Sequence, residues 1–328
     1  MKLFVYNMRE FDELPKFEKY AKDHNVEFAY TTETPGPENY KLAEGYDALS
    51  IITTPTPAEM IDAMQDNGIK VISTRTIGYD HIDIAHARKV GMGIAHVTYD
   101  PAAVAEYTVM MILIACRKMR YIMAKAEVQD FRLGIDKIGK EIINSTVGVI
   151  GAGRIGERVI RILNGFGARV LVYDIFKRDD VAKMAEYVDL ETIYKECDII
   201  TLHAPATEEN HHMLNNETFG KMKDDVIIVN CARGHLINTK DLITNLQSGK
   251  IGFAALDVIE NELGLYYNDL SSTIINNEEM AILKDMYNVY LTPHMAFYTD
   301  EAVSNMVENS IIGAKAYLKG EEHSFIVK

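Results

Sequence analysis

The glycine-rich turn at residues 151–156 constrains the fold of this chain more than any other stretch. The sequence runs from the β-branched segment Thr146–Ile150, through Gly-Ala-Gly-Arg-Ile-Gly, into an amphipathic segment that begins at Glu157. A second apolar run follows and ends at Asp174. Strand, glycine turn, helix, strand and acid in this order form the dinucleotide-binding pattern in the context that it requires. We therefore expect a parallel α/β domain that binds a nucleotide.

Each glycine of this turn has a separate physical task. Gly151 permits the tight turn, Gly153 lets backbone amides approach a pyrophosphate, and Gly156 lets the helix pack closely on the sheet. The positive end of the helix dipole then faces the phosphates. Asp174 lies where a carboxylate accepts from the ribose hydroxyls, and it would repel a 2′-phosphate, so NAD is expected rather than NADP. The alternatives are a tight turn that binds nothing and a site for S-adenosylmethionine.

Length and composition narrow the class of protein. A chain of 328 residues is enough for about two domains of ~150 residues each. The net charge of −14, without a block of Lys or Arg, argues against binding to nucleic acid. No apolar run approaches the ~20 residues of a membrane span, and the first residues are typical of a strand rather than a signal peptide. The three cysteines are widely spaced and odd in number, which indicates a reducing cytoplasm.

Strand-like and helix-like segments alternate along the chain, which predicts right-handed βαβ crossovers and parallel sheets. In the first hundred residues we expect strands at 3–6, 26–30, 48–52, 71–73 and 93–97, and helices at 13–24, 57–66 and 82–90. Six further strands are expected at 146–150, 168–173, 199–202, 226–229, 254–256 and 289–291. The fold class is therefore α/β, with two doubly wound parallel-sheet units of the Rossmann or flavodoxin type.

Two long helical segments flank the second unit. Pro101 opens a helical pattern that extends to about Glu127. The run at residues 110–114 is apolar on all sides, which suits a helix buried between layers or at a subunit contact. An amphipathic helix at 300–319 closes the chain, and the first domain is discontinuous if this helix returns to it.

Polar side chains follow successive strands of the second unit, where ligands of doubly wound sheets bind. Arg233 comes after the strand at 226–229, Glu260 and Glu262 come after 254–256, and His294 comes after 289–291. Taken singly, an Arg beside a Gly is often part of a surface salt bridge, and a lone His is usually a turn residue. Together at the strand ends of a nucleotide domain, they indicate catalysis.

These side chains suit hydride transfer to a 2-oxo acid. The Arg233 guanidinium offers two parallel donors to a carboxylate and can polarise the adjacent ketone. The His294 imidazole can donate a proton to the forming alkoxide. A carboxylate such as Glu262, hydrogen-bonded to that imidazole, would orient it and favour its protonated form.

At these residues the chain resembles the D-isomer-specific 2-hydroxyacid dehydrogenases, across essentially its whole length, and their D-lactate dehydrogenase branch in particular. It is similar also to the vancomycin-resistance D-lactate dehydrogenases, but those carry no acid at the position of Asp174 and favour NADP. Because this chain has Asp174, it differs from them and is expected to favour NAD. The stretches that carry the resemblance are 75–83, 105–108, 129–133, 151–156 with Asp174, 230–234, 257–262 and 292–299.

The resemblance implies an NAD-dependent enzyme that reversibly transfers hydride from NADH to a 2-oxo acid, by default pyruvate to D-lactate. It implies a discontinuous substrate-binding domain at 1–100 and 298–328, an inserted NAD-binding domain at 101–297 and a cleft between them. It also implies a homodimer built on the NAD domain. In the catalytic set, Arg233 would bind the substrate, and His294 with Glu262 would act as acid and base.

The resemblance extends to the binding residues. Those implied for the substrate, besides Arg233, are the backbone amides of Ile77 and Gly78, with Tyr99 and Phe297. Those implied for NAD, besides the three glycines and Asp174, are Arg154, Ile155, Ala204, Pro205, Asn210, Cys231, Ala232 and Asp257.

Substrate size and metal binding are two further questions. Many D-lactate dehydrogenases present an aromatic residue near the positions of Ile51 and Ile52; an aliphatic residue there would leave room for branched or aromatic 2-oxo acids.

His203 and the pair His211 and His212 have no Cys or acidic partner at ligand spacing, and adjacent side chains usually diverge. We therefore expect no metal site.

Two other functions compete with a dehydrogenase. One is an NAD(H)-sensing interaction protein like the C-terminal-binding-protein corepressors, which share this fold and triad. The pattern at 75–83 and 294–299 and the lack of an appended disordered tail argue against it. The other is a methyltransferase, which gives no role to Arg233 and His294 together.

Overall fold

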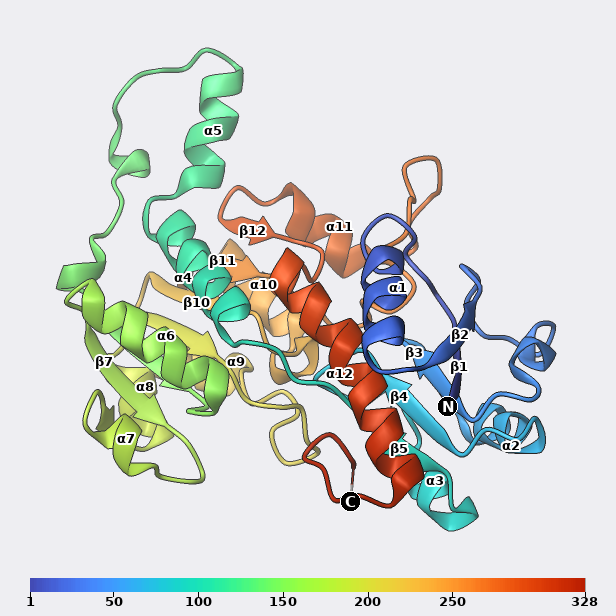
Figure 1. Ribbon diagram of the computed structural model, residues 1–328. Coiled ribbons are helices and arrows are strands. Elements are labelled where there is room, and N and C mark those ends of the chain that lie inside the picture. Colours follow the sequence, from blue (N-terminus) through green and yellow to red (C-terminus); the bar gives the residue numbers. More distant parts are fainter. Residues whose placement is uncertain (328) are drawn as a thin grey trace. The chain divides into compact units, whose positions relative to one another are not determined.

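The computed structural model describes residues 1–327, so Lys328, in the expected segment 298–328, lies outside the described residues. Contacts between Cα atoms divide the chain into two compact units (Figure 1). The first unit contains Met1–Asp100 and the residues from Tyr298 onward, and the second is Pro101–Phe297.

The first unit is built on a parallel sheet that has five strands within residues 1–327, in the order β2-β1-β3-β4-β5. This is the flavodoxin-like order of a doubly wound sheet. Its strands are β1 (Lys2–Val5), β2 (Glu27–Tyr30), β3 (Ala48–Ile51), β4 (Val71–Thr74) and β5 (Gly93–Ala95). Its helices are α1 (Leu14–Asp23), α2 (Ala58–Asp66), α3 (Ile84–Val90) and α12 (Asp300–Lys319), with the 3₁₀ turn η1 (Tyr40–Ala43).

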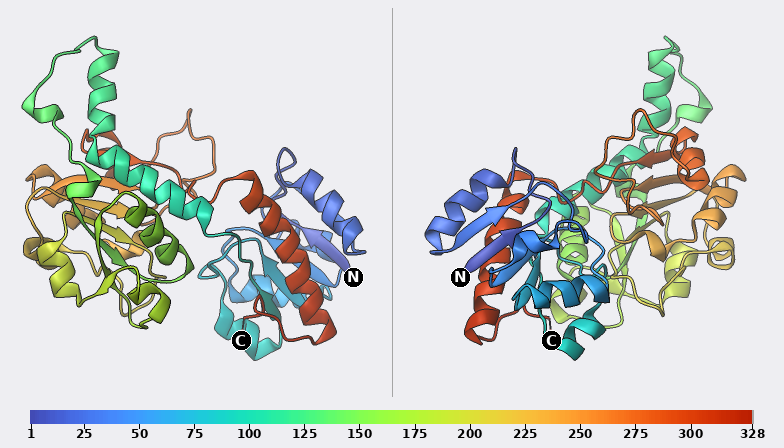
Figure 2. Two further views of the ribbon diagram at one scale, coloured as in Figure 1. Left: turned by 60° about the vertical axis from the view of Figure 1, so that its left-hand side comes forward. Right: turned by 90° about the vertical axis from the view of Figure 1, so that its right-hand side faces the viewer.

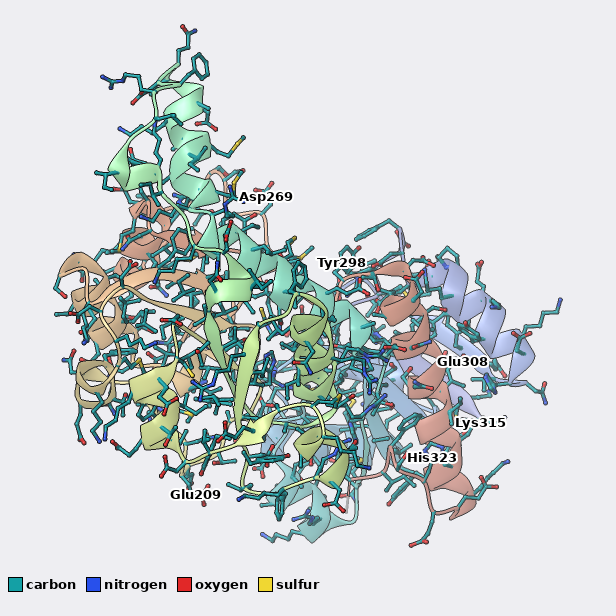
Figure 3. All side chains as sticks on the ribbon, turned by 90° about the vertical axis from the view of Figure 1, so that its left-hand side faces the viewer. Glu209, Asp269, Tyr298, Glu308, Lys315 and His323 are labelled. Carbon is teal, nitrogen blue, oxygen red and sulfur yellow. The ribbon has the colours of Figure 1, made fainter. Side chains whose placement is uncertain are left out.

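Alternating side chains direct the helices of this unit to opposite faces of its sheet. Leu3 and Val5 of β1 share one core with residues of α1 and α12, whereas Phe4 shares another with residues of α2 and α3. Figure 2 shows α12, which closes the chain, beside the strands of this first unit. On α12 (Figure 3), the Glu308 carboxylate lies 3.2 Å from Nε2 of His24, and Nζ of Lys315 donates to the carbonyl oxygen of His24 at 2.6 Å.

A buried ion pair ties the strand ends of this unit together. The Arg75 guanidinium, which follows β4, donates through Nε to Glu13 at 2.8 Å and through Nη1 to Ser50 at 3.0 Å. Its Nη2 donates to the carbonyl oxygens of Tyr6 and Asn7. Both charged side chains are fully buried, and burial lowers the pKa of Arg75, although Glu13 opposes this shift. The pair joins the ends of β1, β3 and β4 to the start of α1.

Glu13→Ala is expected to lower the free energy of unfolding by about 3–5 kcal/mol, because it leaves the buried Arg75 charge without its partner. Urea unfolding measures this change. The matched control is Glu18→Ala on the exposed side of α1, which should change stability by at most about 0.5 kcal/mol. Equal effects of the two substitutions would contradict a stabilising role for the buried pair.

The second unit is also built on a parallel sheet, with seven strands in the described residues and the order β12-β11-β10-β9-β6-β7-β8. The strands β6 to β11 have the strand order of the Rossmann fold. Successive strands are added on one side of β6 up to β8, and from β9 onward they are added on its other side. The expected six strands are present; the two-residue β8 was missed because it is too short to form a periodic pattern. The strands are β6 (Thr146–Ile150), β7 (Arg169–Tyr173), β8 (Glu186–Tyr187), β9 (Ile199–Leu202), β10 (Val226–Asn230), β11 (Ile251–Leu256) and β12 (Val289–Leu291).

Helices cover both faces of this second sheet. Residues of α8, α9, α10 and α11 form one core with strand residues such as Ile200 and Ile228, while α4 and α6 contact each other and the strands. The helices are α4 (Ala102–Cys116), α5 (Met119–Glu127), α6 (Arg154–Gly165), α7 (Asp179–Ala182), α8 (Leu190–Glu196), α9 (Asn216–Lys221), α10 (Thr239–Gln247) and α11 (Glu278–Asp285). The 3₁₀ turns are η2 (Ile135–Lys137), η3 (Ile142–Asn144) and η4 (Gly234–Leu236).

The single helix expected from Pro101 to about Glu127 is wrong. The structure has two helices, α4 and α5, because Lys118 adopts a left-handed backbone conformation with φ of 50° and interrupts the helix. The apolar α4 has eight buried residues, whereas α5 has none. Among the residues that the structure describes, no helix combines the length and the apolar character needed to span a membrane.

Candidate active site

The glycine turn between β6 and α6 has the geometry that nucleotide binding requires. Gly151 has φ of 99°, and a Cβ atom there would lie 2.6 Å from the carbonyl carbon of His203. A Cβ atom at Gly156 would lie 1.9 Å from the carbonyl oxygen of Gly151. At Gly153, which caps α6, an added Cβ atom would meet nothing within 4 Å. The turn therefore leaves the start of α6 open at Gly153, where backbone N–H groups can bind a pyrophosphate.

Asp174 lies directly after β7 and beside this turn. Its carboxylate accepts from the backbone N–H of Ala152 at 2.6 Å and of Phe176 at 2.8 Å. The neighbouring cation, Arg178, pairs with Asp180 and donates to the carbonyl oxygen of Ala152. A carboxylate held in this position suits the ribose hydroxyls of NAD. The turn and Asp174 together fit that cofactor.

The loops after β9 and β10 contain further residues expected around the cofactor. Ala204 and Pro205 follow β9, and Asn210 shapes their loop by donating to the carbonyl oxygen of Pro205 at 2.7 Å and accepting from the N–H of Thr207. Cys231 follows β10 and is buried. Burial raises the pKa of its thiol far above the ordinary value, so it does not act as a thiolate nucleophile.

The loop that carries Arg233 is organised by Asn230, whose structural role the sequence did not indicate. Asn230, the last residue of β10, is fully buried. Its Nδ2 donates to the carbonyl oxygen of Arg233 at 2.8 Å, and its Oδ1 accepts from the N–H of Ala232 at 3.0 Å. Asn230 therefore closes the turn from which the half-buried Arg233 extends. Its position at a strand end was the available signal.

His294 and Glu262 form a close pair. The Nδ1 atom of His294 lies 2.6 Å from Oε1 of Glu262, and both side chains are half-buried. Glu262 is itself placed by the backbone N–H of Ile259, which donates to Oε2 at 3.1 Å. With Nδ1 directed at the carboxylate, Nε2 is the ring nitrogen that can exchange a proton with a substrate. The pair therefore has the geometry of an acid/base group with a fixed orientation.

Asp257 has a role that sequence reasoning missed. The sequence predicts that it contacts the cofactor; in addition, its fully buried carboxylate accepts from Thr292 at 2.6 Å and from the backbone N–H groups of Met295 and Ala296 at 2.8 and 2.9 Å. Burial raises the pKa of this carboxyl, although these hydrogen bonds oppose the shift. Asp257 therefore holds the Thr292 side chain before His294 and the backbone of the two residues after it.

Tyr267 also contacts the His294 backbone, and nothing in the sequence pattern indicated it. Its hydroxyl donates to the carbonyl oxygen of His294 at 2.7 Å. His294, Tyr267 and Asn261, which precedes Glu262, all have left-handed backbone conformations, with φ of 52°, 66° and 57°. Non-glycine residues adopt this conformation at a cost and cluster at functional sites. The contact from Tyr267 stabilises one such strained backbone.

The substrate residues expected from sequence belong to both units. Phe297 lies against His294, with ring centroids 6.5 Å apart in a T-shaped arrangement. Ile77 and Gly78 follow β4, where Thr76 donates to the carbonyl oxygen of Gly78 at 2.6 Å, and Tyr99 follows β5. The structure thus brings Phe297 to the acid/base pair and places the other three at strand ends of the first unit's sheet.

Comparisons with known proteins agree with this geometry. Residues 109–296 match the family model described as "D-isomer specific 2-hydroxyacid dehydrogenase, NAD binding domain". The chain is 42% identical to an aromatic 2-oxoacid reductase of Clostridium sporogenes, over 98% of this chain and 97% of the relative.

Two solved structures are similar along the whole chain. One is a D-lactate dehydrogenase from Treponema pallidum, with a TM-score of 0.90, 35% identity and full coverage of both chains. The other is a D-2-hydroxyisocaproate dehydrogenase, with a TM-score of 0.89, 35% identity and coverage of 100% of this chain and 99% of that one.

Proposed function

Because the chain belongs to the D-isomer-specific 2-hydroxyacid dehydrogenases, which are NAD-dependent oxidoreductases, we propose that Arg233, His294 and Glu262 carry out its reaction on a 2-oxo acid. The observation that carries this proposal is the 2.6 Å contact between His294 and Glu262. His294 follows β12 and Glu262 follows β11, at the strand ends of the sheet that also carries the glycine turn and Asp174.

The reaction is the reduction of a 2-oxo acid to a D-2-hydroxy acid. NADH, when bound, supplies the hydride that adds to the carbonyl carbon. The Arg233 guanidinium binds the substrate carboxylate and polarises the ketone. His294 donates a proton from Nε2 to the carbonyl oxygen as it becomes an alkoxide, and in the reverse direction it accepts that proton. Glu262 keeps the imidazole oriented through Nδ1.

The test is NADH oxidation followed at 340 nm with a panel of 2-oxo acids, and chiral analysis of the product. We expect turnover that yields the D-isomer, with NADH used in preference to NADPH because of Asp174. No turnover with any member of the panel would refute the proposed reaction, and an L-product would refute the stereochemistry. The comparisons give no support to a corepressor-like or methyltransferase function.

We propose the cofactor and substrate contacts residue by residue. We assign Arg154, Ile155, Ala204, Pro205, Asn210, Cys231, Ala232 and Asp257, with Gly151, Gly153, Gly156 and Asp174, to the surroundings of NAD. We assign Ile77, Gly78, Tyr99, Arg233 and Phe297 to the substrate. Their supporting observation is that nearly all lie just beyond the carboxyl ends of parallel strands, where such folds bind ligands.

The substrate range is proposed to include branched and aromatic 2-oxo acids as well as pyruvate. The residue just beyond β3 is the half-buried, aliphatic Ile52, whereas Ile51 is fully buried in the sheet. The reductase from Clostridium sporogenes named above acts on aromatic 2-oxo acids. Values of kcat/KM for pyruvate, 4-methyl-2-oxopentanoate and phenylpyruvate test this range, and a strong preference for pyruvate would contradict it.

Tyr267→Phe is expected to lower kcat by about two- to tenfold, which corresponds to one neutral hydrogen bond. The substitution removes the donor that holds the His294 carbonyl and keeps the aromatic ring. The KM for NADH should stay unchanged, because the contact is to the proposed acid/base residue. Tyr287→Phe, at a tyrosine equally exposed at 57%, is the matched control. An unchanged kcat for Tyr267→Phe would remove this contact from the mechanism.

A homodimer built through the NAD domain is proposed from an exposed apolar arm at residues 119–143. The arm contains α5, which has no buried residue, and the segment that follows it. Phe131, Leu133 and Ile135 are 78%, 100% and 83% exposed. An apolar surface of this kind on a globular protein marks an interaction site, and a second copy of the chain offers the same surface for symmetric burial.

Phe131→Asp is expected to convert the dimer into monomers, because it places a charge in the buried contact. Light scattering coupled to size-exclusion chromatography measures the mass in solution. Phe11→Asp is the control, because Phe11 is also 78% exposed but belongs to the first unit. A dimer that survives the change at Phe131, or one that is lost equally with Phe11→Asp, would contradict the arm as the interface.

A cytoplasmic location is proposed from the cysteines. Cys116, Cys197 and Cys231 are all buried and free of disulfides within residues 1–327. Burial raises the pKa of Cys116 to about 11 and that of Cys197 to about 12, so both stay in the thiol form. Free thiols without disulfides suit a reducing compartment.

A further inference from the structure

A second histidine–carboxylate group lies on the NAD domain, apart from the His294–Glu262 pair. His211, His212 and Glu260 each offer one ligand atom, and these atoms lie within 4.8 Å of one another. The two histidines belong to the loop between β9 and α9, and Glu260 belongs to the loop after β11. Glu209, labelled in Figure 3, lies two residues before His211 on the same loop.

The backbone of His212 explains why two adjacent histidines lie together. His212 has a left-handed conformation with φ of 53°, so its ring stacks on that of His211 with centroids 3.8 Å apart. The N–H of His212 donates to the carbonyl oxygen of His235 at 2.8 Å, which fixes this turn. The expectation that adjacent histidine side chains diverge is wrong here.

Glu260 is the acidic partner that the sequence did not reveal. Its Oε1 lies 2.6 Å from Nε2 of His212, although the two residues are 48 positions apart. Its Oε2 accepts from the backbone N–H and the hydroxyl of Thr239 at 2.8 and 2.7 Å. Thr239 therefore orients an anionic oxygen toward the histidines.

The surroundings leave room for an ion with its water. A cavity of about 540 Å³ adjoins the group and is lined by Ala206, Thr207, Glu208, His211 and His235. The ring of His235 lies 6.1 Å from that of His211, between centroids. His211, His235 and Glu208 are exposed to solvent, so an ion can reach the group without local unfolding.

We propose that His211, His212 and Glu260 bind a divalent transition-metal ion, with Zn²⁺ as the representative ion. Imidazole nitrogen and carboxylate oxygen are ordinary Zn²⁺ ligands at about 2.0–2.2 Å, which puts ligand atoms roughly 3.3 Å apart in a tetrahedral site. The three ligand atoms lie within 4.8 Å of one another, so rotation of the exposed His211 side chain and a small separation of the 2.6 Å contact between His212 and Glu260 bring them to this spacing. The hydrogen bonds from Thr239 to Oε2 hold the carboxylate as outer partners. Water from the adjoining cavity fills the remaining position.

The metal group is separate from the proposed catalytic pair. Glu262, two residues after Glu260, pairs with His294, and neither residue belongs to the metal set. Removing a metal ligand such as His211 therefore leaves the hydride-transfer machinery intact. The test therefore measures metal binding and stability, and its outcome does not depend on the proposed reaction.

Zn²⁺ titration of the tag-free full chain by isothermal calorimetry tests the site. We expect one Zn²⁺ to bind per chain. His211→Ala and Glu260→Gln should each lower the affinity for Zn²⁺ by about tenfold or more, and kcat should stay unchanged in His211→Ala. The matched control is His86→Ala. His86 forms a similar contact with Asp62 at 2.7 Å, and among residues 1–327 that pair belongs to no group with a third ligand. This control should bind Zn²⁺ as tightly as the unmodified chain.

A stability measurement gives an independent reading. Because an ion that binds the folded state stabilises it, Zn²⁺ should raise the Tm of the unmodified chain and of His86→Ala but not that of His211→Ala. Absence of saturable binding would overturn the proposal. Binding that His211→Ala leaves intact, or that His86→Ala weakens equally, would overturn it as well.

Discussion

His294→Ala is expected to lower kcat by about 10²–10⁴-fold, because it removes the group that donates a proton to the forming alkoxide. The alanine variant keeps the glycine turn and Asp174, so its affinity for NADH should stay close to that of the unmodified enzyme. Stopped-flow reduction of a 2-oxo acid measures the rate, and isothermal calorimetry with NADH measures the affinity.

The controls separate chemistry from folding. His86→Ala removes a histidine that pairs with Asp62 in the first unit, and it should leave kcat unchanged. Glu262→Gln keeps the size of the side chain that faces Nδ1 but removes its charge, so it should lower kcat less than His294→Ala. An unchanged rate in His294→Ala would remove this residue from the acid/base role. A parallel loss of NADH affinity would instead point to a damaged domain.

Local patterns in the sequence predicted most of the fold. The strands alternate with helices at short range, and the steric demands at Gly151 and Gly156 are made by atoms of the turn itself and of the neighbouring β9 loop. The helix break at Lys118 could not be predicted in this way, because a lysine with φ of 50° is stabilised by its surroundings rather than by its own preference. The strand order also was predicted only as far as the general rules of doubly wound sheets.

In the candidate site, too, residues in local patterns were predicted and contacts between distant residues were not. Arg233, Glu262 and His294 could be named because each follows a strand, and strand ends meet at one edge of a parallel sheet. The contact of Glu260 with His212 spans 48 residues, and that of Tyr267 with His294 spans 27. Both depend on the paths of loops, which follow no period in the sequence, so sequence reasoning missed them.

Arg233→Lys is expected to lower kcat/KM for the 2-oxo acid by roughly 10- to 100-fold, the equivalent of one charge-assisted hydrogen bond of about 1.5–3 kcal/mol. A single ammonium cannot present the two parallel donors of a guanidinium, so the carboxylate is held less firmly and the ketone is less polarised. KM should therefore rise while kcat falls. Arg161→Lys, at an exposed arginine that pairs with Glu157 on α6, should change neither value. If KM alone rose in Arg233→Lys, the guanidinium would bind the substrate without polarising its carbonyl; near-normal kinetics would exclude both roles.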